Sequence, residues 1–366
     1  MGAAAQSAIA VEVDGVSKRF SHRVKGDVYA ARNVRFTAAP GEFVTLLGPS
    51  GCGKTTTLRM IAGFEQPDEG RIRFGNDDVT HVPANRRGIG FVFQNYALFP
   101  HLSVFDNVAY GLEVRGEPAR DVAARVGDVL ALVGLTGYEH QFSAQLSGGE
   151  QQRVALARAI VIHPRVLLFD EPLSNLDAKL RVQMRTDIRE LQRRLAITTV
   201  YVTHDQEEAM AVSDRIVVMN QGTIVQEGTA EDLYHRPASE FVATFVGRVN
   251  LVPGTVVEAD GDGATIAALG TTFRARARGA LQAGDGAKLV LRPEAIEVVR
   301  GVDGLAARVV TRTFLGEKVE YQLACGGTSL QAIRPSSAGG EAIGVGDPVA
   351  LHFADETLVA LPASDR

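Results

Sequence analysis

The fold of most of this chain is decided by Phe43-Val44-Thr45-Leu46-Leu47-Gly48-Pro49-Ser50-Gly51-Cys52-Gly53-Lys54-Thr55. Its first five residues form an apolar run that predicts a buried strand, and the residues from Lys54 through Met60-Ile61-Ala62 predict a helix. Between them, Gly48 to Thr55 fits G-x-x-x-x-G-K-[ST], the pattern of a loop that cradles phosphates with backbone N–H groups. The positive end of the following helix adds to the attraction for phosphate charge. The stretch therefore predicts a nucleoside triphosphate site on an α/β fold, a property that several unrelated classes of protein share.

The residue types within this loop have separate expected roles. Glycines at positions 48, 51 and 53 let the backbone turn, Lys54 should reach the β- and γ-phosphates, and Thr55 should bind Mg²⁺. Nucleotide contacts are expected from Gly48, Pro49, Ser50, Gly51, Cys52, Gly53, Lys54, Thr55 and Thr56. The thiol of Cys52 is interpreted as a small side chain that fits the loop. The helix N-terminus and Lys54 are nevertheless expected to favour its thiolate and so its reactivity.

A second apolar run, Val166-Leu167-Leu168-Phe169, ends in two carboxylates, Asp170 and Glu171. A strand that ends in acids places them at the carboxyl edge of a parallel sheet, where ligands bind in open α/β folds. Asp170 is the expected holder of Mg²⁺, by way of water. Glu171 is the expected base or polariser for the attacking water, because phosphoryl transfer depends mainly on positioning and electrostatics.

About a hundred residues after the phosphate loop lies Leu146-Ser147-Gly148-Gly149-Glu150. Ser147 with Glu150 three residues later fits a capping box, so one interpretation is a well-capped helix and nothing more. A helix N-terminus with two glycines is also an anion site, where backbone can approach a phosphate closely. With both motifs in place, the chain resembles the ATPase subunit of an ATP-binding-cassette (ABC) transporter over about residues 10 to 240.

This resemblance assigns roles to three further residues. Gln94 matches the glutamine that senses Mg²⁺ and the attacking water, and His204 matches the histidine that hydrogen-bonds the γ-phosphate. Phe20 occupies the position of the aromatic residue that stacks on adenine, with Tyr29 as the alternative. The implied catalytic set is Glu171, His204 and Gln94, the implied Mg²⁺ set is Thr55, Gln94 and Asp170, and the cofactors are ATP and Mg²⁺.

The resemblance also implies a dimer. In this family two ATP molecules are sandwiched between two subunits, and the Leu-Ser-Gly-Gly-Glu end of a helix faces the phosphate loop of the other subunit. The loop Ser174-Asn175-Leu176-Asp177 matches the family's loop across the same interface. A monomer would lack half of each site, so a homodimer or a pair of ATPase subunits is expected. The contacts expected in trans are Leu146, Ser147, Gly148, Gly149, Glu150 and Asp177.

Length and composition agree with a globular protein of two or three units, since the chain has 366 residues, 45% hydrophobic and 22% charged. The net charge of −5 gives no indication of a nucleic-acid partner. No apolar run approaches the roughly 20 residues of a membrane span, and no signal peptide precedes Val11. Two cysteines, Cys52 and Cys325, cannot form a disulfide framework and favour a reducing compartment. We therefore expect a peripheral protein at the cytoplasmic face of an inner membrane, which it reaches through partner proteins.

The chain falls into three stretches. Residues 1–10 are small and Ala-rich, and we expect a flexible end. From 11 to 244, strand-like runs alternate with helical patterns, which predicts an α/β P-loop NTPase cassette with a parallel or mixed sheet. Within it, residues from about 95 to 164 are mostly helical, where the resembling family inserts a helical subdomain that docks on membrane subunits. The aromatics of Tyr96-Ala97-Leu98-Phe99-Pro100 fit such a contact, or else a hydrophobic core turn.

From 245 to 366, short β-like runs punctuated by Gly and Asp predict a small all-β domain. We expect a five-stranded oligomer-binding (OB) type barrel or a pair of them. Leu291-Arg292-Pro293-Glu294 resembles the run in TOBE-type regulatory tails of bacterial solute-importer ATPases. The stretch shows no aromatic or basic clustering that would favour nucleic acid.

These observations predict the ATPase of a bacterial importer, with transmembrane permease subunits and, indirectly, a periplasmic or lipoprotein solute-binding protein as partners. Residues 95–101 look most like polyamine, ferric-iron and sulfate importer ATPases, and among these we favour spermidine and putrescine. The alternative of a different class is a soluble ABC ATPase that acts on DNA or the ribosome. An ABC ATPase that acts on DNA would need a long coiled coil between the two motifs. One that acts on the ribosome would need two cassettes in one chain.

Overall fold

The computed structural model describes residues 8–22, 26–261, 263–301, 303–336 and 343–363. The chain divides into two compact units, Met1–Ala230 and Glu231–Arg366. This division lies 14 residues before the boundary at 244/245 expected from the sequence, because two short helices group with the second unit. Of the expected flexible end, residues 1–7 lie outside the described residues.

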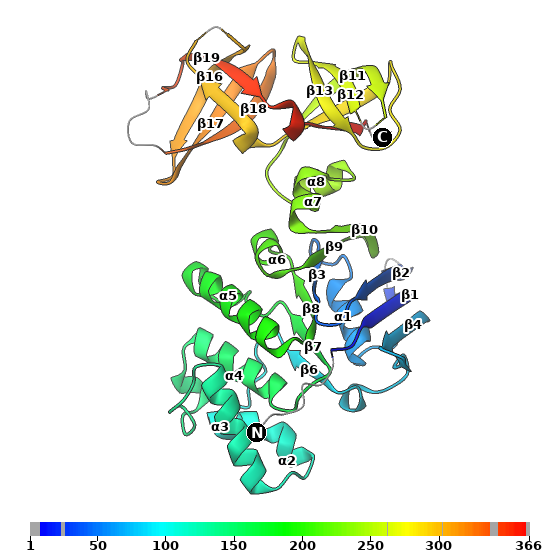
Figure 1. Cartoon of the computed structure of the whole chain (residues 1–366), viewed down its shortest axis with the longest axis vertical. Coiled ribbons are helices and arrows are strands. Elements are labelled where there is room, and N and C mark those ends of the chain that lie inside the picture. Colours follow the sequence, from blue (N-terminus) through cyan, green and yellow to red (C-terminus); the bar gives the residue numbers. More distant parts are fainter. Residues whose placement is uncertain (1–7, 23–25, 262, 302, 337–342, 364–366) are drawn as a thin grey trace. The chain divides into compact units, whose positions relative to one another are not determined.

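The first unit is built on a six-stranded sheet in the order β10-β9-β3-β8-β7-β6 (Figure 1). All neighbours pair in parallel except β10, which runs antiparallel to β9. The expected strands are present, and every residue of β3, β7 and β8 is buried, as their apolar sequences require. The bounds are β3 (Phe43–Leu47), β6 (Ile89–Val92), β7 (Val166–Asp170), β8 (Thr198–Thr203), β9 (Arg215–Asn220) and β10 (Thr223–Gly228).

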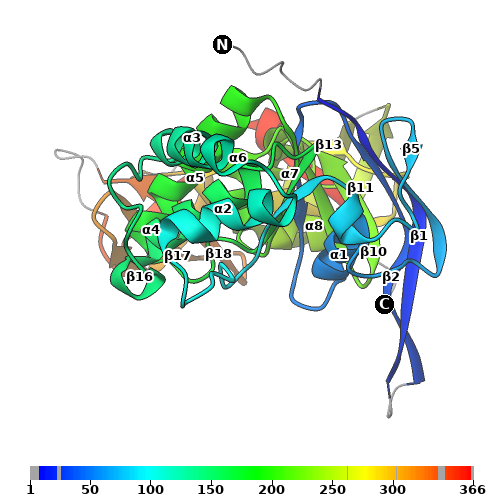
Figure 2. The same ribbon diagram turned by 90° about the horizontal axis from the view of Figure 1, so that it is seen from below.

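A second, antiparallel sheet of the first unit has the order β2-β1-β4-β5. Its strands are β1 (Val11–His22), β2 (Gly26–Ala38), β4 (Glu69–Phe74) and β5 (Asp77–Asp78). Figure 2 shows the β1–β2 hairpin reaching beyond the rest of this unit. Helix α1 (Lys54–Ala62) contributes buried residues to an apolar cluster that contains residues from both sheets. The helix that starts at the phosphate loop therefore holds the two sheets together.

Helices fill the segment between Gln94 and Pro164, as the sequence pattern predicts. They are α2 (Val104–Val114), α3 (Ala119–Leu132) and α4 (Gly148–Ile160), with a short 3₁₀ turn at Ser143–Gln145. Helices α5 (Ala178–Leu195) and α6 (Gln206–Val212) follow β7 and β8. One apolar cluster contains residues of α2, α3, α4 and α5. The helices after Gln94 are thus packed as one body with the helix that follows β7.

The second unit is β-rich, with two short helices, α7 (Ala230–His235) and α8 (Glu240–Phe245), at its start. Strands β11-β12-β13-β20-β14 close into a barrel, and β15-β19-β16-β17-β18 form a five-stranded sheet. The prediction of an all-β region built on one or two five-stranded elements is confirmed, with one of the two closed. The bounds are β11 (Asn250–Asp260), β12 (Gly263–Ala268), β13 (Thr271–Ala277), β14 (Gly286–Leu291), β15 (Ile296–Val299), β16 (Leu305–Phe314), β17 (Lys318–Cys325), β18 (Thr328–Pro335), β19 (Pro348–Phe353) and β20 (Val359–Pro362).

Arg292 of the Leu-Arg-Pro-Glu run connects several segments of this unit. Its buried guanidinium donates to the carbonyl oxygens of Tyr234 (2.9 Å), Ala243 (3.0 Å) and Arg248 (3.0 Å). Its guanidinium carbon also lies 4.0 Å from the centre of the Tyr234 ring. One side chain therefore binds α7 and α8 to the barrel.

Across the described ranges, no helix is both long enough and apolar enough to cross a lipid bilayer.

Candidate functional site

The phosphate loop joins the end of β3 to the start of α1 and is shaped by glycines. Gly51 and Gly53 have φ values of 79° and 103°, in the left-handed region that side chains disfavour. A Cβ on Gly53 would lie 2.0 Å from the carbonyl oxygen of Ala30, and a Cβ on Gly48 would lie 2.3 Å from that of Met219. Both positions therefore exclude any larger residue.

Lys54 lies inside the loop with only 4% of its surface exposed. Its Nζ donates to the carbonyl oxygens of Gly48 (2.8 Å) and Pro49 (3.0 Å). Both acceptors are neutral, so the charge of the ammonium group is left for an anionic ligand. This arrangement supports the expected contact of Lys54 with phosphate.

The expectation that Cys52 carries a reactive thiolate is wrong. The side chain is 3% exposed, and burial raises the pKa of its thiol above the ordinary value. Lys54 opposes this shift, with its Nζ 4.0 Å from the Cys52 Sγ, but burial is the larger cause. The interpretation of Cys52 as a small side chain that fits is the one that the structure supports.

Two oxygen ligands meet at the end of the phosphate loop. The Thr55 hydroxyl donates to Oδ1 of Asp170 at 3.0 Å, and Asp170 is the last residue of β7. Burial raises the pKa of the Asp170 carboxyl, and the neighbouring Glu171 adds to the rise. A hydroxyl and a carboxylate are the oxygen ligands that Mg²⁺ prefers, so these residues fit the expected ion.

Gln94 follows β6, and its side chain is exposed. Its backbone carbonyl accepts a hydrogen bond from Nδ2 of Asn175 at 2.9 Å. This bond joins the segment after β6 to the Ser174–Asp177 loop. Just beyond it, Tyr96 is buried in the apolar cluster, whereas Phe99 is partly exposed. The turn therefore combines a core residue with an accessible aromatic residue.

Glu171 and His204 are in direct contact, 33 residues apart in sequence. Nδ1 of His204 lies 2.9 Å from Oε2 of Glu171. The backbone of Glu171 has φ +45°, an unusual conformation for a residue with a side chain. Its N–H donates to the Val202 carbonyl of β8 at 3.0 Å, which holds this conformation. The structure thus brings the two expected catalytic residues together beyond the end of the sheet.

Ser147 caps α4 in the predicted capping box. Its Oγ accepts from the N–H of Glu150 (3.4 Å), and the Glu150 carboxylate accepts from the Ser147 N–H at 2.7 Å. The bond from that N–H is the main reason why the pKa of Glu150 is lowered. Leu146 is buried in the apolar cluster, so its side chain has a packing role. Ser147 itself is exposed and is available to a second molecule.

Asp177 caps α5, where its carboxylate accepts from the Leu180 N–H at 2.9 Å. The start of α4 packs against this segment: a Cβ on Gly148 would lie 3.1 Å from Leu176, and one on Gly149 would lie 2.8 Å from Leu180. The two glycines therefore let the two segments expected in trans contacts approach each other.

Phe20 and Tyr29 lie on opposite faces of the β1–β2 hairpin. Phe20 pairs with Val28 and Arg19 pairs with Tyr29, and successive side chains alternate between faces. Both rings are partly exposed and each has a cation nearby, Lys18 at Phe20 and Arg19 at Tyr29. One adenine can stack on only one face, so the two candidates remain alternatives.

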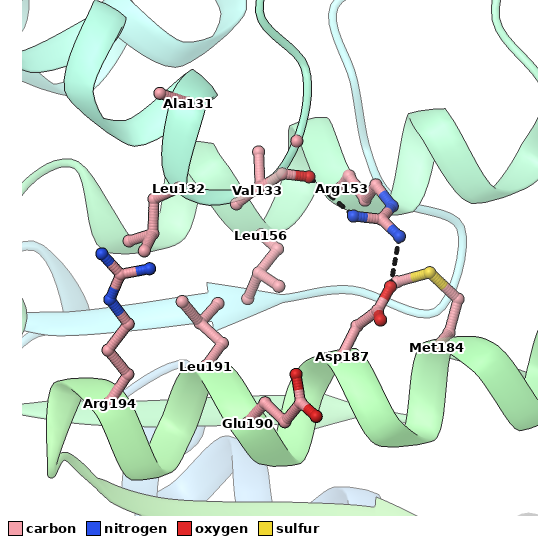
Figure 3. Close-up of a pocket in the computed structure, with 11 residues that line it drawn as sticks. Ala131, Leu132, Val133, Arg153, Leu156, Met184, Asp187, Glu190, Leu191 and Arg194 are labelled. Carbon is pink, nitrogen blue, oxygen red and sulfur yellow. Dashed lines mark hydrogen bonds and ion pairs between the residues drawn. The ribbon is translucent and has the colours of Figure 1, made fainter.

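A separate cavity of about 300 Å³ lies between the end of α3, α4 and α5 (Figure 3). Leu156 of α4 and Leu191 of α5 face it, and Arg153 donates to the Val133 carbonyl while pairing with Asp187. None of the phosphate-loop residues lines it. The cavity is therefore distinct from the nucleotide site.

Sequence reasoning missed three charged residues beside Glu171 and His204, namely Arg181, Asp205 and Glu208. A small cavity brings them together with the two expected catalytic side chains. The available signal was Arg181 four residues after Asp177, one helical turn from the loop. Asp205 directly follows His204 in the sequence.

Two family models match the chain. The model described as "ABC transporter" matches residues 31–174, and the model described as "TOBE domain" matches residues 289–361. The first match contains the phosphate loop, the Leu-Ser-Gly-Gly-Glu motif, and the carboxylates of Asp170 and Glu171 at the end of β7. The second lies within the β-rich unit.

Curated relatives resemble the chain over most of its length. The Fe(3+) ions import ATP-binding protein FbpC 1 of Rhizobium meliloti (strain 1021) is 52% identical over 85% of this chain and 88% of the relative. The corresponding protein of Agrobacterium fabrum is 52% identical over 81% of this chain and 84% of the relative. The spermidine/putrescine import ATP-binding protein PotA of Marinobacter nauticus is 52% identical over 76% of each chain.

Among solved structures, the dimer of a bacterial ABC transporter cassette matches 60% of this chain and 98% of its own, with a TM-score of 0.54 and 31% identity. A post-hydrolysis state of a cassette bound to ADP and phosphate matches the same share of each chain, with a TM-score of 0.53 and 31% identity.

Proposed function

The chain belongs to the family of ABC transporter ATPases of importers, and from this premise we propose that it energises the import of ferric iron. The observation that supports this solute is the 50–53% identity to Fe(3+) import ATP-binding proteins over 81–86% of the chain. The preference for polyamines drawn from residues 95–101 is not confirmed. A polyamine importer stays the second candidate, supported by the spermidine/putrescine relative.

In this proposal ATP binds with its phosphates in the loop Gly48–Thr56. Lys54 holds the phosphate charge, and an aromatic ring of the β1–β2 hairpin, Phe20 or Tyr29, stacks on adenine. Thr55, Asp170 and Gln94 would hold Mg²⁺, which would supply positive charge to the phosphates. Positioning by these groups is what the reaction requires of the protein.

Glu171 and His204 carry the hydrolytic step. Glu171 orients and polarises the attacking water, and His204 contacts the γ-phosphate. The bond between their side chains, 2.9 Å long, holds each in place for the other. A water bound between Glu171 and the γ-phosphate would lose its proton toward the carboxylate.

Each ATP-binding site is completed by a second subunit. The exposed Ser147 at the N-terminus of α4, the two glycines after it and Asp177 contact the ATP held by the partner. The similarity to a dimeric ABC cassette supports this arrangement. Closure of the two subunits around two ATP molecules would move the attached permease subunits, and hydrolysis would reset them.

The remaining partners follow from the role of an importer ATPase. The chain would sit at the cytoplasmic face of the inner membrane, bound to permease subunits through the segment around Phe99 and the helices that follow it. A solute-binding protein would deliver the solute from the other side. The β-rich residues from about 245 onward would regulate transport and leave ATP chemistry to the rest of the chain.

The solute is tested by uptake in cells that lack this chain. Loss of ⁵⁵Fe(III) uptake, restored by the wild-type chain and not by Glu171→Gln, is the expected result. Radiolabelled spermidine is measured in the same cells as the matched comparison. Loss of spermidine uptake with unchanged iron uptake would replace ferric iron by polyamines as the cargo.

A further inference from the structure

A cluster of charged side chains lies directly behind Glu171 and His204. A cavity of about 30 Å³ is lined by Glu171, Ser174, Arg181, Thr203, His204, Asp205 and Glu208. That volume accommodates about one water molecule. The cavity joins the two residues proposed to act on ATP to three charged residues that belong to none of the motifs.

Arg181 is the centre of this cluster. It lies on α5, one turn after Asp177, the residue that caps the helix. Its Nη2 donates to the Leu176 carbonyl (3.1 Å), and its Nη1 donates to the carboxylate of Asp205 (3.1 Å), the residue after His204. Because the guanidinium is planar and rigid, it fixes the distance between the Ser174–Asp177 loop and the His204 segment.

The third edge of the guanidinium faces Glu208, which is 3% exposed. Nε of Arg181 lies 3.7 Å from Oε1 of Glu208, while Oε2 accepts from the hydroxyls of Tyr201 (3.1 Å) and Thr203 (2.7 Å). Asp205 is held from its other side by two backbone N–H groups of α6. The Glu208 carboxylate is therefore fixed to β8 and the Asp205 carboxylate to the start of α6, and Arg181 joins the loop to both.

We propose that Arg181 is a positioning residue that couples the Ser174–Asp177 loop to His204. The inference rests on the proposed function, in which this loop contacts the partner's ATP while His204 contacts the ATP of its own subunit. A shift of the loop on closure reaches His204 through the Leu176 carbonyl, the guanidinium and Asp205. Arg181 thereby makes hydrolysis at one composite site depend on the occupancy of the other.

The decisive variant is Arg181→Met, which keeps an unbranched apolar stem and removes the planar donor. Because misplaced catalytic groups slow chemistry more than binding, kcat should fall about 10- to 100-fold while the KM for ATP stays within about twofold. The Hill coefficient for ATP should fall from near 2 to about 1, since the sites lose their coupling. Arg181→Lys can make one of the two bonds at a time and should fall between wild type and Arg181→Met.

Arg185→Met is the matched control. Arg185 lies one turn further along α5, and its Nη2 is 3.5 Å from the carboxylate of Glu207 on α6. It bridges the same two helices without reaching the loop, so kcat and the Hill coefficient should stay near wild type. An equal loss in Arg185→Met would show that general packing of α5 on α6 is responsible, and would overturn the proposal.

A double-mutant cycle tests whether Arg181 acts through Asp205. Asp205→Asn retains a side-chain cap for α6 and removes the charge that Arg181 binds. If Arg181 acts through Asp205, the double variant should be no slower than the slower single variant. If the fold-losses in kcat of the two single variants multiply in the double variant, the two residues act separately, which contradicts the coupling.

Failure of this inference differs from failure of the proposed function. If the wild-type chain forms no ATP-dependent dimer, the composite site itself is wrong. If the wild-type dimer hydrolyses ATP cooperatively and Arg181→Met behaves like it, only the coupling role of Arg181 is wrong.

Discussion

At the scale of single residues, the site depends on side chains held in conformations that the sequence does not reveal. The motif predicted that Glu171 would follow a buried strand, but the positive φ of Glu171 and its bond to His204 depend on contacts with β8. Backbone strain of this kind persists only where the surroundings determine it. The residue types were therefore predictable, whereas their mutual geometry required the folded sheet.

Glu171→Gln should retain ATP binding and lose turnover by about a hundredfold or more, because general-base assistance is removed. Closure would no longer end in hydrolysis, so Mg-ATP should trap a dimer that size-exclusion chromatography detects. Glu190→Gln, at an exposed position of α5, is the control and should hydrolyse ATP normally. Turnover near the wild-type rate in Glu171→Gln would remove this residue from the base role.

Cys52 should react slowly with maleimide or iodoacetamide in the folded protein. Burial raises the pKa of the thiol, so the thiolate that attacks these reagents is scarce at pH 7 to 8 and becomes abundant only at a pH above the ordinary pKa of a thiol. Mass spectrometry should find both cysteines unlabelled in the native chain and labelled in urea, since Cys325 is also buried. Cys52→Ser should stay active. Rapid, ATP-protected labelling of Cys52 at neutral pH would restore the original expectation of a reactive thiolate.

At the scale of helices and strands, predictions succeeded where burial is uniform or strictly periodic. The apolar runs of β3, β7 and β8 needed no tertiary information. In α5, Met184, Ile188 and Leu191 recur at helical spacing and are buried, but Leu195, the last helical residue, is 38% exposed. The antiparallel pairing of β1 with β4, and the closure of the barrel by β20, join distant and partly polar segments. Such pairing leaves no local pattern in the sequence.

Arg87 illustrates an element contact that no pattern predicted. It is buried, and its guanidinium donates to the carbonyls of Met60 and Ile61 at the end of α1 and to those of Thr80 and Val82. Burial lowers its pKa to about 10, so it remains charged at neutral pH. This one side chain satisfies carbonyls that the helix end leaves unpaired.

Arg87→Met should therefore destabilise the first unit strongly. Removing the guanidinium leaves several buried carbonyls without a donor, and we expect a loss of about 3 kcal/mol or more in the free energy of unfolding. Urea unfolding followed by circular dichroism measures it. Arg86→Met is the matched control, because Arg86 is exposed, and should change stability by less than about 0.5 kcal/mol. Equal effects in the two variants would contradict the role of the Arg87 hydrogen bonds.

At the scale of the whole molecule, the chain divides into two compact units, and helix α8 shows where the division lies. Helix α8 packs with the β-rich unit, where Ala243 shares an apolar cluster with Val290, Val359 and Leu361. Cutting the chain near Gly247, close to the boundary expected from the sequence, would leave this helix without its partners. A cut after Ala230 follows the division between the two compact units.

A chain ending at Ala230 should therefore stay monodisperse and bind ATP with an affinity near that of the full chain, because the phosphate loop and its sheets have their own core. A chain ending at Gly247 should bind ATP as well but aggregate more, because α8 exposes apolar surface. Light scattering and fluorescent-nucleotide titration compare the two. Loss of ATP binding in the shorter chain alone would mean that the ATP-binding unit extends beyond Ala230, toward residue 245.

The dimer is the largest-scale feature that the motifs predict, and it can be tested with two inactive chains. Lys54→Ala damages the phosphate loop, and Ser147→Arg damages the surface proposed to face the partner's ATP. In a mixed dimer one composite site carries both lesions and the other carries none. An equal mixture should therefore contain up to about a quarter of the wild-type number of intact sites, since half of the dimers are mixed and each has one intact site. Its ATPase activity should be measurable but below that share, because hydrolysis at the intact site also depends on the damaged site.

Ser147→Arg also removes a helix cap, which by itself costs about 1 kcal/mol of stability, so the loss of a cap must be separated from the loss of a contact. Ser103→Arg provides this control, because Ser103 caps α2 through the same kind of capping box with Asp106. If the cap alone mattered, Ser103→Arg would be as inactive as Ser147→Arg. The expected result is an active Ser103→Arg chain, an inactive Ser147→Arg chain, and ATPase activity regained when the latter is mixed with Lys54→Ala. Mixed dimers that form, as shown by affinity tags on each chain, and yet regain no activity would mean that Ser147 does not complete the partner's site.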